Sequence, residues 1–231
     1  MAMIQPLILL LETATEVCSV GLCRGEELLS IRETSEGQDH AAKITCFISE
    51  VMEEAGCTLP QIDAVAVSDG PGSYTSLRIG ASTAKGICYA LQKPLVVTDT
   101  LACLAFQAAQ VYASADIYFP MIDARRMEVY GAIFDAKLQK LKDTAAQVIS
   151  VEWWDAEIKP LGEIAICGNG AEKVFSLING EKVVKIPLHC SAEWMIPKAL
   201  EAFTVEHFSD IAYYTPCYLK PPNITLPKKT V

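Results

Sequence analysis

The stretch SDGPGSYTSLRIG, Ser68–Gly80, decides how the rest of the chain is interpreted, because it joins two apolar runs of different character. Residues 62–67 before it are short and apolar, which predicts a buried strand. Residues 74–91 after it carry only two charges, Arg78 and Lys85, and predict a helix that is small and apolar over most of its circumference. A strand, a glycine-rich turn and a helix in succession are typical of an α/β layer.

The loop between that strand and that helix has the composition of an anion-binding turn. Gly70 and Gly72 allow positive φ and the close approach of a ligand, and a helix that begins at Ser73 or Tyr74 presents free N–H groups. The pattern is not Walker A, because no Lys-Ser/Thr pair follows the last glycine, and it is not G-x-G-x-x-G. The alternative is that Ser73 or Thr75 only caps a helix after a Pro-Gly turn.

The same order of elements occurs twice along the chain. In the first copy we predict strands at 7–11, 17–23, 27–32, 62–67 and 94–99, and helices at 39–55, 74–91 and 100–112. In the second copy we predict strands at 117–123, 128–135, 138–150, 163–168 and 182–188, and helical segments at 151–158, 169–178 and 191–203. This tandem β-β-β-α-β-α-β-α order predicts the α/β actin-like ATPase (ASKHA, RNase H-like) fold, with one lobe over residues 1–113 and another over residues 114–231. The C-terminal helix and tail are candidates to pack back on the first lobe.

Each copy begins with a hairpin whose first strand ends on an acid, Glu12 in LETATEVCSV and Asp123 in IDARRMEVYGA. In ATPases of this fold the two hairpins face each other across a cleft and hold phosphates and metal. ETATEV lacks the glycines that let a phosphate approach, and the two acids could instead cap turns or pair with Arg125 or Arg126. The sequence therefore offers candidate carboxylates for phosphoryl transfer, but it lacks the glycines that would let a phosphate bind at the first hairpin.

A further glycine pair surrounds Asn169 in ICGNGAEKV, where the adenosine end of a nucleotide lies in this fold, unless the segment is only a strand–turn–helix junction. The candidate anion- or nucleotide-binding residues are Glu12, Thr13, Gly70, Gly72, Ser73, Thr75, Asp123, Gly168 and Gly170.

Composition narrows the classes of function. The net charge of −9 argues against a broad nucleic-acid-binding face on this chain, although a partner can supply a basic surface. The nine cysteines contain no C-x-x-C pair and are expected to be buried small hydrophobes in a reducing cytoplasm. The apolar run before Glu12 is too short for a signal peptide or a membrane span, so we expect a soluble cytoplasmic protein.

The sequence contains no motif typical of a metal site or of a catalytic nucleophile. A metal site on the helix that begins near His40 would need a second ligand at i+4, on the same face of the helix. That position is Ile44, which cannot bind a metal ion. His189–Cys190 has no second pair at zinc spacing, and GSYTS is not the G-x-S-x-G elbow. We predict no metal ligand and no catalytic residue.

Three strings, LLLETATEVCSVGL, GPGSYTSLRIG and MIDARRMEVYGAIFD, occur in an order and at a spacing that resembles the TsaB (formerly YeaZ) family. These are the non-catalytic actin-like subunits of the bacterial tRNA threonylcarbamoyladenosine (t6A) machinery, within the M22 glycoprotease-like superfamily. The resemblance covers most of the chain and is strongest over residues 7–135. It implies a role in placing threonylcarbamoyl on N6 of adenosine 37 in tRNAs that read ANN codons. It also implies a TsaD-like catalytic paralogue and a TsaE-like ATPase as partners, with tRNA reached through the complex.

The resemblance assigns the first two long helices to the TsaD interface. The positions that it and the helix pattern single out as interface or loop residues are His40, Ile44, Phe47, Ile48, Tyr74, Leu77, Arg78, Ala81, Ser82 and Lys85. The His-x-x-x-His metal motif of TsaD corresponds here to His40-Ala-Ala-Lys-Ile44, so its second ligand is missing. The family usually has Asp in place of Glu12 and commonly Gly in place of Ser76. Both departures disfavour tight nucleotide binding, so we expect no required cofactor and at most weak binding of ATP or ADP.

Three alternatives stay open from the sequence. The chain could be an independent small-molecule kinase or ATPase of this fold, which would depend on Asp123. It could be an M22-type metallopeptidase, although no peptidase constellation is present. It could also be a homodimeric binding module that uses the same helix pair on itself.

Overall fold

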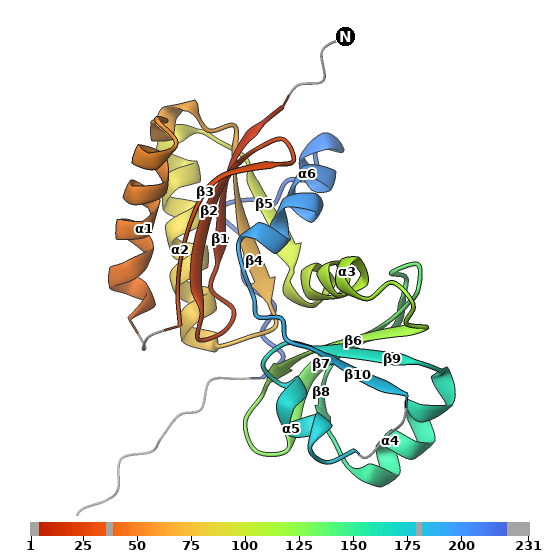
Figure 1. Ribbon diagram of the computed structural model, residues 1–231. Helices are drawn as coiled ribbons and strands as arrows, with labels where there is room; N and C mark the ends of the chain where they lie inside the picture. The colour runs from red at the N-terminus through yellow and green to blue at the C-terminus, as the bar shows by residue number, and fades with distance from the viewer. Residues whose placement is uncertain (1–4, 36–38, 179–181, 221–231) are drawn as a thin grey trace, which may run out of the picture.

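The computed structural model describes residues 5–35, 39–178 and 182–220, and these residues contain two five-stranded sheets (Figure 1). The strands of the first sheet are β1 Leu7–Glu12, β2 Cys18–Arg24, β3 Glu27–Thr34, β4 Ala64–Gly70 and β5 Leu95–Asp99. The strands of the second sheet are β6 Ile117–Asp123, β7 Glu128–Asp135, β8 Lys140–Val148, β9 Ile164–Cys167 and β10 Val183–Ile186.

The two sheets have the same topology. The strand order is β3-β2-β1-β4-β5 in the first sheet and β10-β9-β6-β7-β8 in the second, which is the same arrangement named from the opposite edge. In each copy the first three strands are antiparallel, and the first strand also pairs in parallel with the fourth. The predicted tandem duplication and the predicted fold class are confirmed.

The helices follow in the predicted order. They are α1 His40–Glu54, α2 Tyr74–Leu91, α3 Thr100–Val111, α4 Val151–Glu157, α5 Ala171–Phe175 and α6 Ile196–Thr204, with 3-10 turns η1 Leu59–Gln61, η2 Lys159–Leu161 and η3 Glu193–Met195. The last predicted helix, 191–203, divides into η3 and α6. Pro197 lies in the first turn of α6, where its missing N–H leaves no hydrogen bond unmade.

Strand β1 is buried on both faces, which explains its unbroken apolar sequence. Leu7, Leu9 and Leu11 belong to the core beneath α1 and α2. Ile8 and Leu10 belong to the core beneath η3 and α6. All five side chains are at most 1% exposed.

Two helices cover the sheet of the other copy. Helix α3 follows β5 in the chain, but its Leu101 and Leu104 pack with Tyr118 and Ile122 of the second sheet. Helix α6 follows β10, but its residues pack on the first sheet beside β5 (Figure 1). The predicted boundary at residue 113 therefore divides the strands of the two sheets. It does not divide the helices, because α3 lies before it and packs on the second sheet, while α6 lies after it and packs on the first.

Residues 205–220, which we name the C-terminal strap, run along the first lobe. The Ser209 N–H donates to the Leu95 carbonyl oxygen at 2.8 Å, and the Cys217 N–H donates to that of Asp69 at 2.9 Å. The Lys85 Nζ on α2 donates to the Tyr214 carbonyl oxygen at 3.0 Å. At the end of the strap, Lys220 contacts Glu128 of β7 in the second lobe, so the strap reaches the junction of the two lobes.

All nine cysteines are free thiols. Six of them are buried, as the sequence predicts, but Cys46 is exposed on α1 and Cys57 and Cys217 are half-buried. Burial raises the pKa of the Cys23 and Cys167 thiols to about 12, so these side chains act as neutral core residues.

Candidate functional site

The glycine loop between β4 and α2 packs against the first hairpin. The Ser73 N–H donates to the Ala14 carbonyl oxygen at 2.7 Å, and the Gly70 N–H donates to Thr100 Oγ1 at 3.2 Å. A Cβ on Gly72 would lie 2.1 Å from that Ala14 oxygen. The glycine is therefore needed for contact between two backbones, which fills the space where a phosphate would approach.

The start of α2 is capped by Ser73, one of the two outcomes expected for the loop. Ser73 Oγ accepts a hydrogen bond from the Ser76 N–H at 3.5 Å and from the Ser76 hydroxyl at 2.9 Å. Thr75, the other candidate cap, is exposed at the helix surface. The cap occupies an N–H group of the first turn that an anion would otherwise bind.

The acid of the first hairpin is enclosed. Glu12 is 1% exposed, and its Oε1 accepts a hydrogen bond from the Ala14 N–H at 2.6 Å. Burial raises the pKa of the Glu12 carboxyl to about 7, because the charged form loses its hydration. Thr13 lies against α2, since a Cβ on Gly80 would be 2.3 Å from Thr13 Oγ1. Glu12 thus caps the hairpin turn, as one alternative expects, and does not face an open cleft.

The acid of the second hairpin is exposed and paired. Asp123 Oδ1 accepts hydrogen bonds from the Arg125 N–H and from Lys173 Nζ, each at 2.6 Å. The alternative of a turn-capping acid is again confirmed, but its ion-pair partner is Lys173 of α5 and not the side chain of Arg125 or Arg126. A lysine in contact with this carboxylate neutralises the charge that a metal ion would need.

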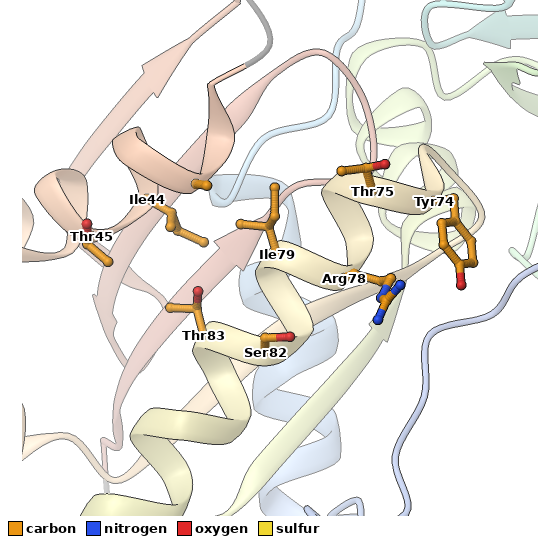
Figure 2. Close-up of a pocket in the computed structure, with 9 residues that line it drawn as sticks. Ile44, Thr45, Tyr74, Thr75, Arg78, Ile79, Ser82 and Thr83 are labelled. Atoms are coloured by element: carbon orange, nitrogen blue, oxygen red, sulfur yellow. The ribbon is translucent and has the colours of Figure 1, made fainter. Parts of the chain in front are cut away.

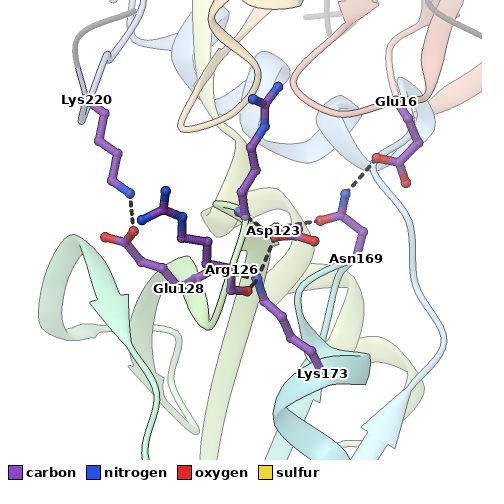
Figure 3. Close-up of polar contacts among 8 residues, drawn as sticks. Glu16, Asp123, Arg126, Glu128, Asn169, Lys173 and Lys220 are labelled. Atoms are coloured by element: carbon purple, nitrogen blue, oxygen red, sulfur yellow. Dashed lines mark hydrogen bonds and ion pairs between the residues drawn. The ribbon is translucent and has the colours of Figure 1, made fainter. Parts of the chain in front are cut away.

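Asn169 connects the two hairpins. Its Oδ1 accepts a hydrogen bond from the Asp123 N–H at 2.9 Å, and its Nδ2 donates to Glu16 Oε2 at 2.7 Å (Figure 3). The flanking glycines permit close packing, since a Cβ on Gly168 would lie 2.2 Å from the Met121 carbonyl oxygen. The two hairpins therefore meet at the lobe junction through Glu16 and Asn169, and Asp123 is the candidate residue that this bridge includes.

Sequence reasoning missed the residues that hold this junction together. They are Glu16, Glu128, Asn169 as a bridging side chain, Lys173 and Lys220. The only local signal was the position of Asn169 between two glycines. Lys173 is 50 residues from Asp123, so nothing in the local pattern indicates their contact.

His40 links α1 to the first hairpin. It is buried, and its Nε2 lies 3.1 Å from the Thr15 carbonyl oxygen and 3.3 Å from that of Val17. An Nε2–H tautomer donates to these oxygens, which gives the ring a structural role. Among residues 5–35, 39–178 and 182–220, no group of three or more His, Cys, Asp or Glu side chains is placed to hold a metal ion.

The predicted interface residues divide into two sets. Six are buried against the core of the first lobe, namely His40, Ile44, Phe47, Ile48, Leu77 and Ala81. The other four, Tyr74, Arg78, Ser82 and Lys85, reach the surface of α2. Lys85 is engaged by the C-terminal strap, and the Tyr74 ring lies 4.5 Å from that of Tyr218 in the same strap. The exposed part of the predicted interface is thus smaller than the sequence suggests.

A shallow groove of about 400 Å³ lies between α1 and α2. Figure 2 shows Ile44 of α1 and Ile79 of α2 directed toward one another across it. The remaining lining residues are Ala41, Thr45, Tyr74, Thr75, Arg78, Ser82 and Thr83. Arg78 is the only charged side chain among them, and most of the others are small. Such a surface suits the close approach of a protein helix better than that of a polar metabolite.

None of the helices in the described ranges is both long enough and apolar enough to cross a bilayer.

Comparison with known proteins gives three kinds of similarity. The model of the family TsaD, tRNA N6-adenosine threonylcarbamoyltransferase, matches residues 29–159, more than half of the chain. The chain is 37% identical over 123 residues to a Haemophilus influenzae protein called tRNA threonylcarbamoyladenosine biosynthesis protein TsaB. This match covers 53% of the chain and 51% of the relative, so the chain spans about half the length of that protein.

Other relatives match over nearly their whole length. The Escherichia coli protein of the same name is 29% identical over 92% of this chain and 94% of its own. The solved structure of YeaZ from Pseudomonas aeruginosa superimposes with a TM-score of 0.76 and 27% identity, covering 93% of this chain and 100% of that one.

Proposed function

The chain belongs to the family of TsaD, tRNA N6-adenosine threonylcarbamoyltransferase, in its TsaB/YeaZ group, and from this premise we propose that it is a non-catalytic subunit for t6A formation. It assists a TsaD-like catalytic paralogue, which places threonylcarbamoyl on adenosine 37 of tRNAs that read ANN codons. A TsaE-like ATPase joins the pair, and the complex works in the cytoplasm. The names of the Haemophilus and Escherichia relatives support the assignment to this reaction.

One observation supports the non-catalytic part of the proposal: each group that phosphoryl transfer would need already has a hydrogen-bond or ion-pair partner within the chain. Lys173 contacts the Asp123 carboxylate, and the Ala14 N–H donates to Glu12. The Ser73 N–H in the glycine loop donates to a backbone carbonyl oxygen. Because phosphoryl transfer needs carboxylates that can hold a metal ion and donors that can hold phosphate, we assign no catalytic residue and no required cofactor to this chain.

The partner binds at the groove between α1 and α2. Ile44 and Ile79 form an apolar floor, and Thr45 and Ser82 leave room at the rim. A stable protein interface buries more than about 1,000 Å², so this groove is the centre of a larger contact over both helices. Arg78 at its edge supplies one charge with which a partner carboxylate can pair.

Substitutions at exposed groove positions test this surface. The double variant Thr45→Arg/Ser82→Arg places two bulky charges in the groove without touching the core, because both residues are exposed. We expect its affinity for the TsaD-like partner, measured by calorimetry, to fall at least about tenfold, since two unpaired charges would be desolvated. The control Ala156→Arg lies on the exposed side of α4 and should bind as wild type does. Equal affinity of the groove variant and the control would remove this surface from the proposal.

The subunit role is tested by tRNA modification in vitro with the TsaD- and TsaE-like partners present, with and without this chain. We expect t6A to form at a useful rate only when the chain is added. An independent ATPase instead predicts Mg·ATP turnover by the chain alone that is lost in Asp123→Ala, and weak ATP or ADP binding without turnover agrees with the subunit role. A metallopeptidase predicts one bound metal ion per chain. A homodimer through the same groove contradicts the proposal only if it excludes the partner.

A further inference from the structure

The tip of the second hairpin carries two adjacent arginines, Arg125 and Arg126. Both have positive φ, 69° and 50°, and both are exposed. No residue of the described ranges forms an ion pair or a hydrogen bond with either guanidinium group. The guanidinium groups of these two consecutive residues are thus free to bind a ligand from outside the chain.

The acids around this tip do not neutralise the arginines, because each already has a partner. Asp123 is bound by Lys173, and Glu128 is bound by Lys220 from the C-terminal strap (Figure 3). Glu16 of the first hairpin accepts a hydrogen bond from the neutral Asn169 side chain and keeps its negative charge. The charged groups named here are four cations (Arg125, Arg126, Lys173, Lys220) and three carboxylates (Asp123, Glu128, Glu16), so the tip keeps a net charge of +1, although the chain as a whole carries −9. At physiological salt, charges farther away than about 8 Å are largely screened, so the local charge governs what binds there.

The backbone of the tip is held in place from two sides. The Arg125 N–H donates to Asp123 Oδ1 at 2.6 Å, and Lys173 Nζ donates to the Arg126 carbonyl oxygen at 2.9 Å. The Ala124 N–H also pairs with the Glu128 carbonyl oxygen at 3.1 Å. A ligand that binds the guanidinium groups does not have to order this loop, which lowers the entropic cost of binding.

We propose that Arg125 and Arg126 bind the phosphodiester backbone of the tRNA, so that this chain contacts the substrate of the complex directly. Guanidinium groups match phosphate oxygens in geometry and stay charged at every physiological pH. The identity of the RNA rests on the proposed function. An RNA backbone fits better than a free nucleotide because the arginines are exposed. The N–H groups at the candidate nucleotide-binding positions are already used, that of Asp123 by Asn169 and that of Ser73 by Ala14.

The test compares two doubly substituted chains of equal net charge, each assembled with the TsaD-like partner. Arg125→Gln/Arg126→Gln removes the proposed contacts. Arg24→Gln/Lys137→Gln removes two exposed cations elsewhere on the surface. tRNA affinity is measured by fluorescence anisotropy between about 50 and 300 mM salt. Each lost phosphate contact should reduce the slope of log K against log salt by about 1, and should weaken binding by about tenfold near 0.1 M salt. The control should differ little from wild type.

Equal tRNA affinity and equal salt slope for the two variants would overturn the proposal. So would a wild-type complex whose tRNA affinity does not depend on this chain. Partner affinity and ATP binding are measured by calorimetry on the same proteins. A loss of either one with unchanged tRNA affinity would assign the arginines to an acidic partner surface or to a nucleotide, and would also overturn it. The modification assay separates this result from the subunit role: if wild type supports t6A formation and the arginine variant binds tRNA normally, only the tRNA contact fails.

Discussion

Glu12 and Asp123 occupy equivalent positions in the two copies, at the end of the first strand of each, but they lie in opposite environments. Glu12 is 1% exposed and binds the backbone of its own hairpin. The Asp123 side chain is 46% exposed and forms an ion pair with Lys173. Both copies thus share the backbone position and the turn-capping role of the acid. They differ in its surroundings, since Glu12 is buried and Asp123 is exposed beside a lysine. In the proposed subunit, the first hairpin is a structural contact and the second is the charged surface of the lobe junction.

The largest effect is expected from a feature that both copies share, a glycine packed against the backbone of a hairpin. Gly72→Ala and Gly168→Ala each place a Cβ within 2.2 Å of a carbonyl oxygen, and backbone atoms cannot move aside cheaply. We expect each to lower the free energy of unfolding by roughly 3 kcal/mol or more, measured by urea denaturation.

Gly86→Ala is the matched control for these two variants. A Cβ at this position of α2 meets nothing within 4 Å, so alanine should stabilise the protein by up to about 1 kcal/mol through helix propensity. Similar stability of all three variants would contradict the close packing of the two loops.

The pH dependence of stability should separate the two acids. The Glu12 pKa rises from 4.5 to about 7 on folding, so between these values the native state keeps a proton that the unfolded chain has lost. The free energy of unfolding should therefore decrease as pH rises through this window, by about 3 kcal/mol, and this contribution should level off above it. Glu12→Gln stays neutral and should lack this decrease, which gives it a relative gain at pH 8.

Urea denaturation from pH 4.5 to 8.5 measures this effect, with Asp123→Asn as the control. That variant loses only a partly exposed ion pair, for which about 1 kcal/mol or less is expected, and it should keep the decrease that Glu12 causes. Parallel pH profiles for wild type and Glu12→Gln would show that Glu12 does not carry a proton in the folded protein.

A smaller effect than those of the glycine variants and Glu12→Gln is expected for the side chain that links the two copies. Asn169→Ala removes the side chain that accepts from the Asp123 N–H and donates to Glu16. Because the site is partly open to water, which can replace the lost partners, we expect a decrease of about 1 kcal/mol in the free energy of unfolding. Hydrogen exchange should increase at the Asp123 amide, while amides in the centre of β1 stay protected. Unchanged exchange at Asp123 would argue against the bridge.

The fold was predictable because its signals are local. Apolar periodicity and turn residues are short-range properties, and they were sufficient for the order of strands and helices in both copies. The interface residues show where this method fails. Periodicity identifies the apolar stripe of α1, with Ile44, Phe47 and Ile48, but it does not say whether the stripe faces the chain's own sheet or a partner. The structure buries these residues in the core of the first sheet, where α1 packs on β2 and β3, and leaves the groove rim as the accessible surface.

The sequence by itself determined the duplication, the two hairpins with their terminal acids, and the absence of Walker and His-x-x-x-His motifs at the expected positions. Only the tertiary structure decided that Glu12 is enclosed and that Lys173 neutralises Asp123. It also decided that, within the described part of the chain, the guanidinium groups of Arg125 and Arg126 have no ion-pair or hydrogen-bond partner. The reason is physical. Hydrophobic pattern and turn chemistry act between neighbours in the chain, whereas desolvation and charge pairing depend on atoms that folding brings together from distant segments.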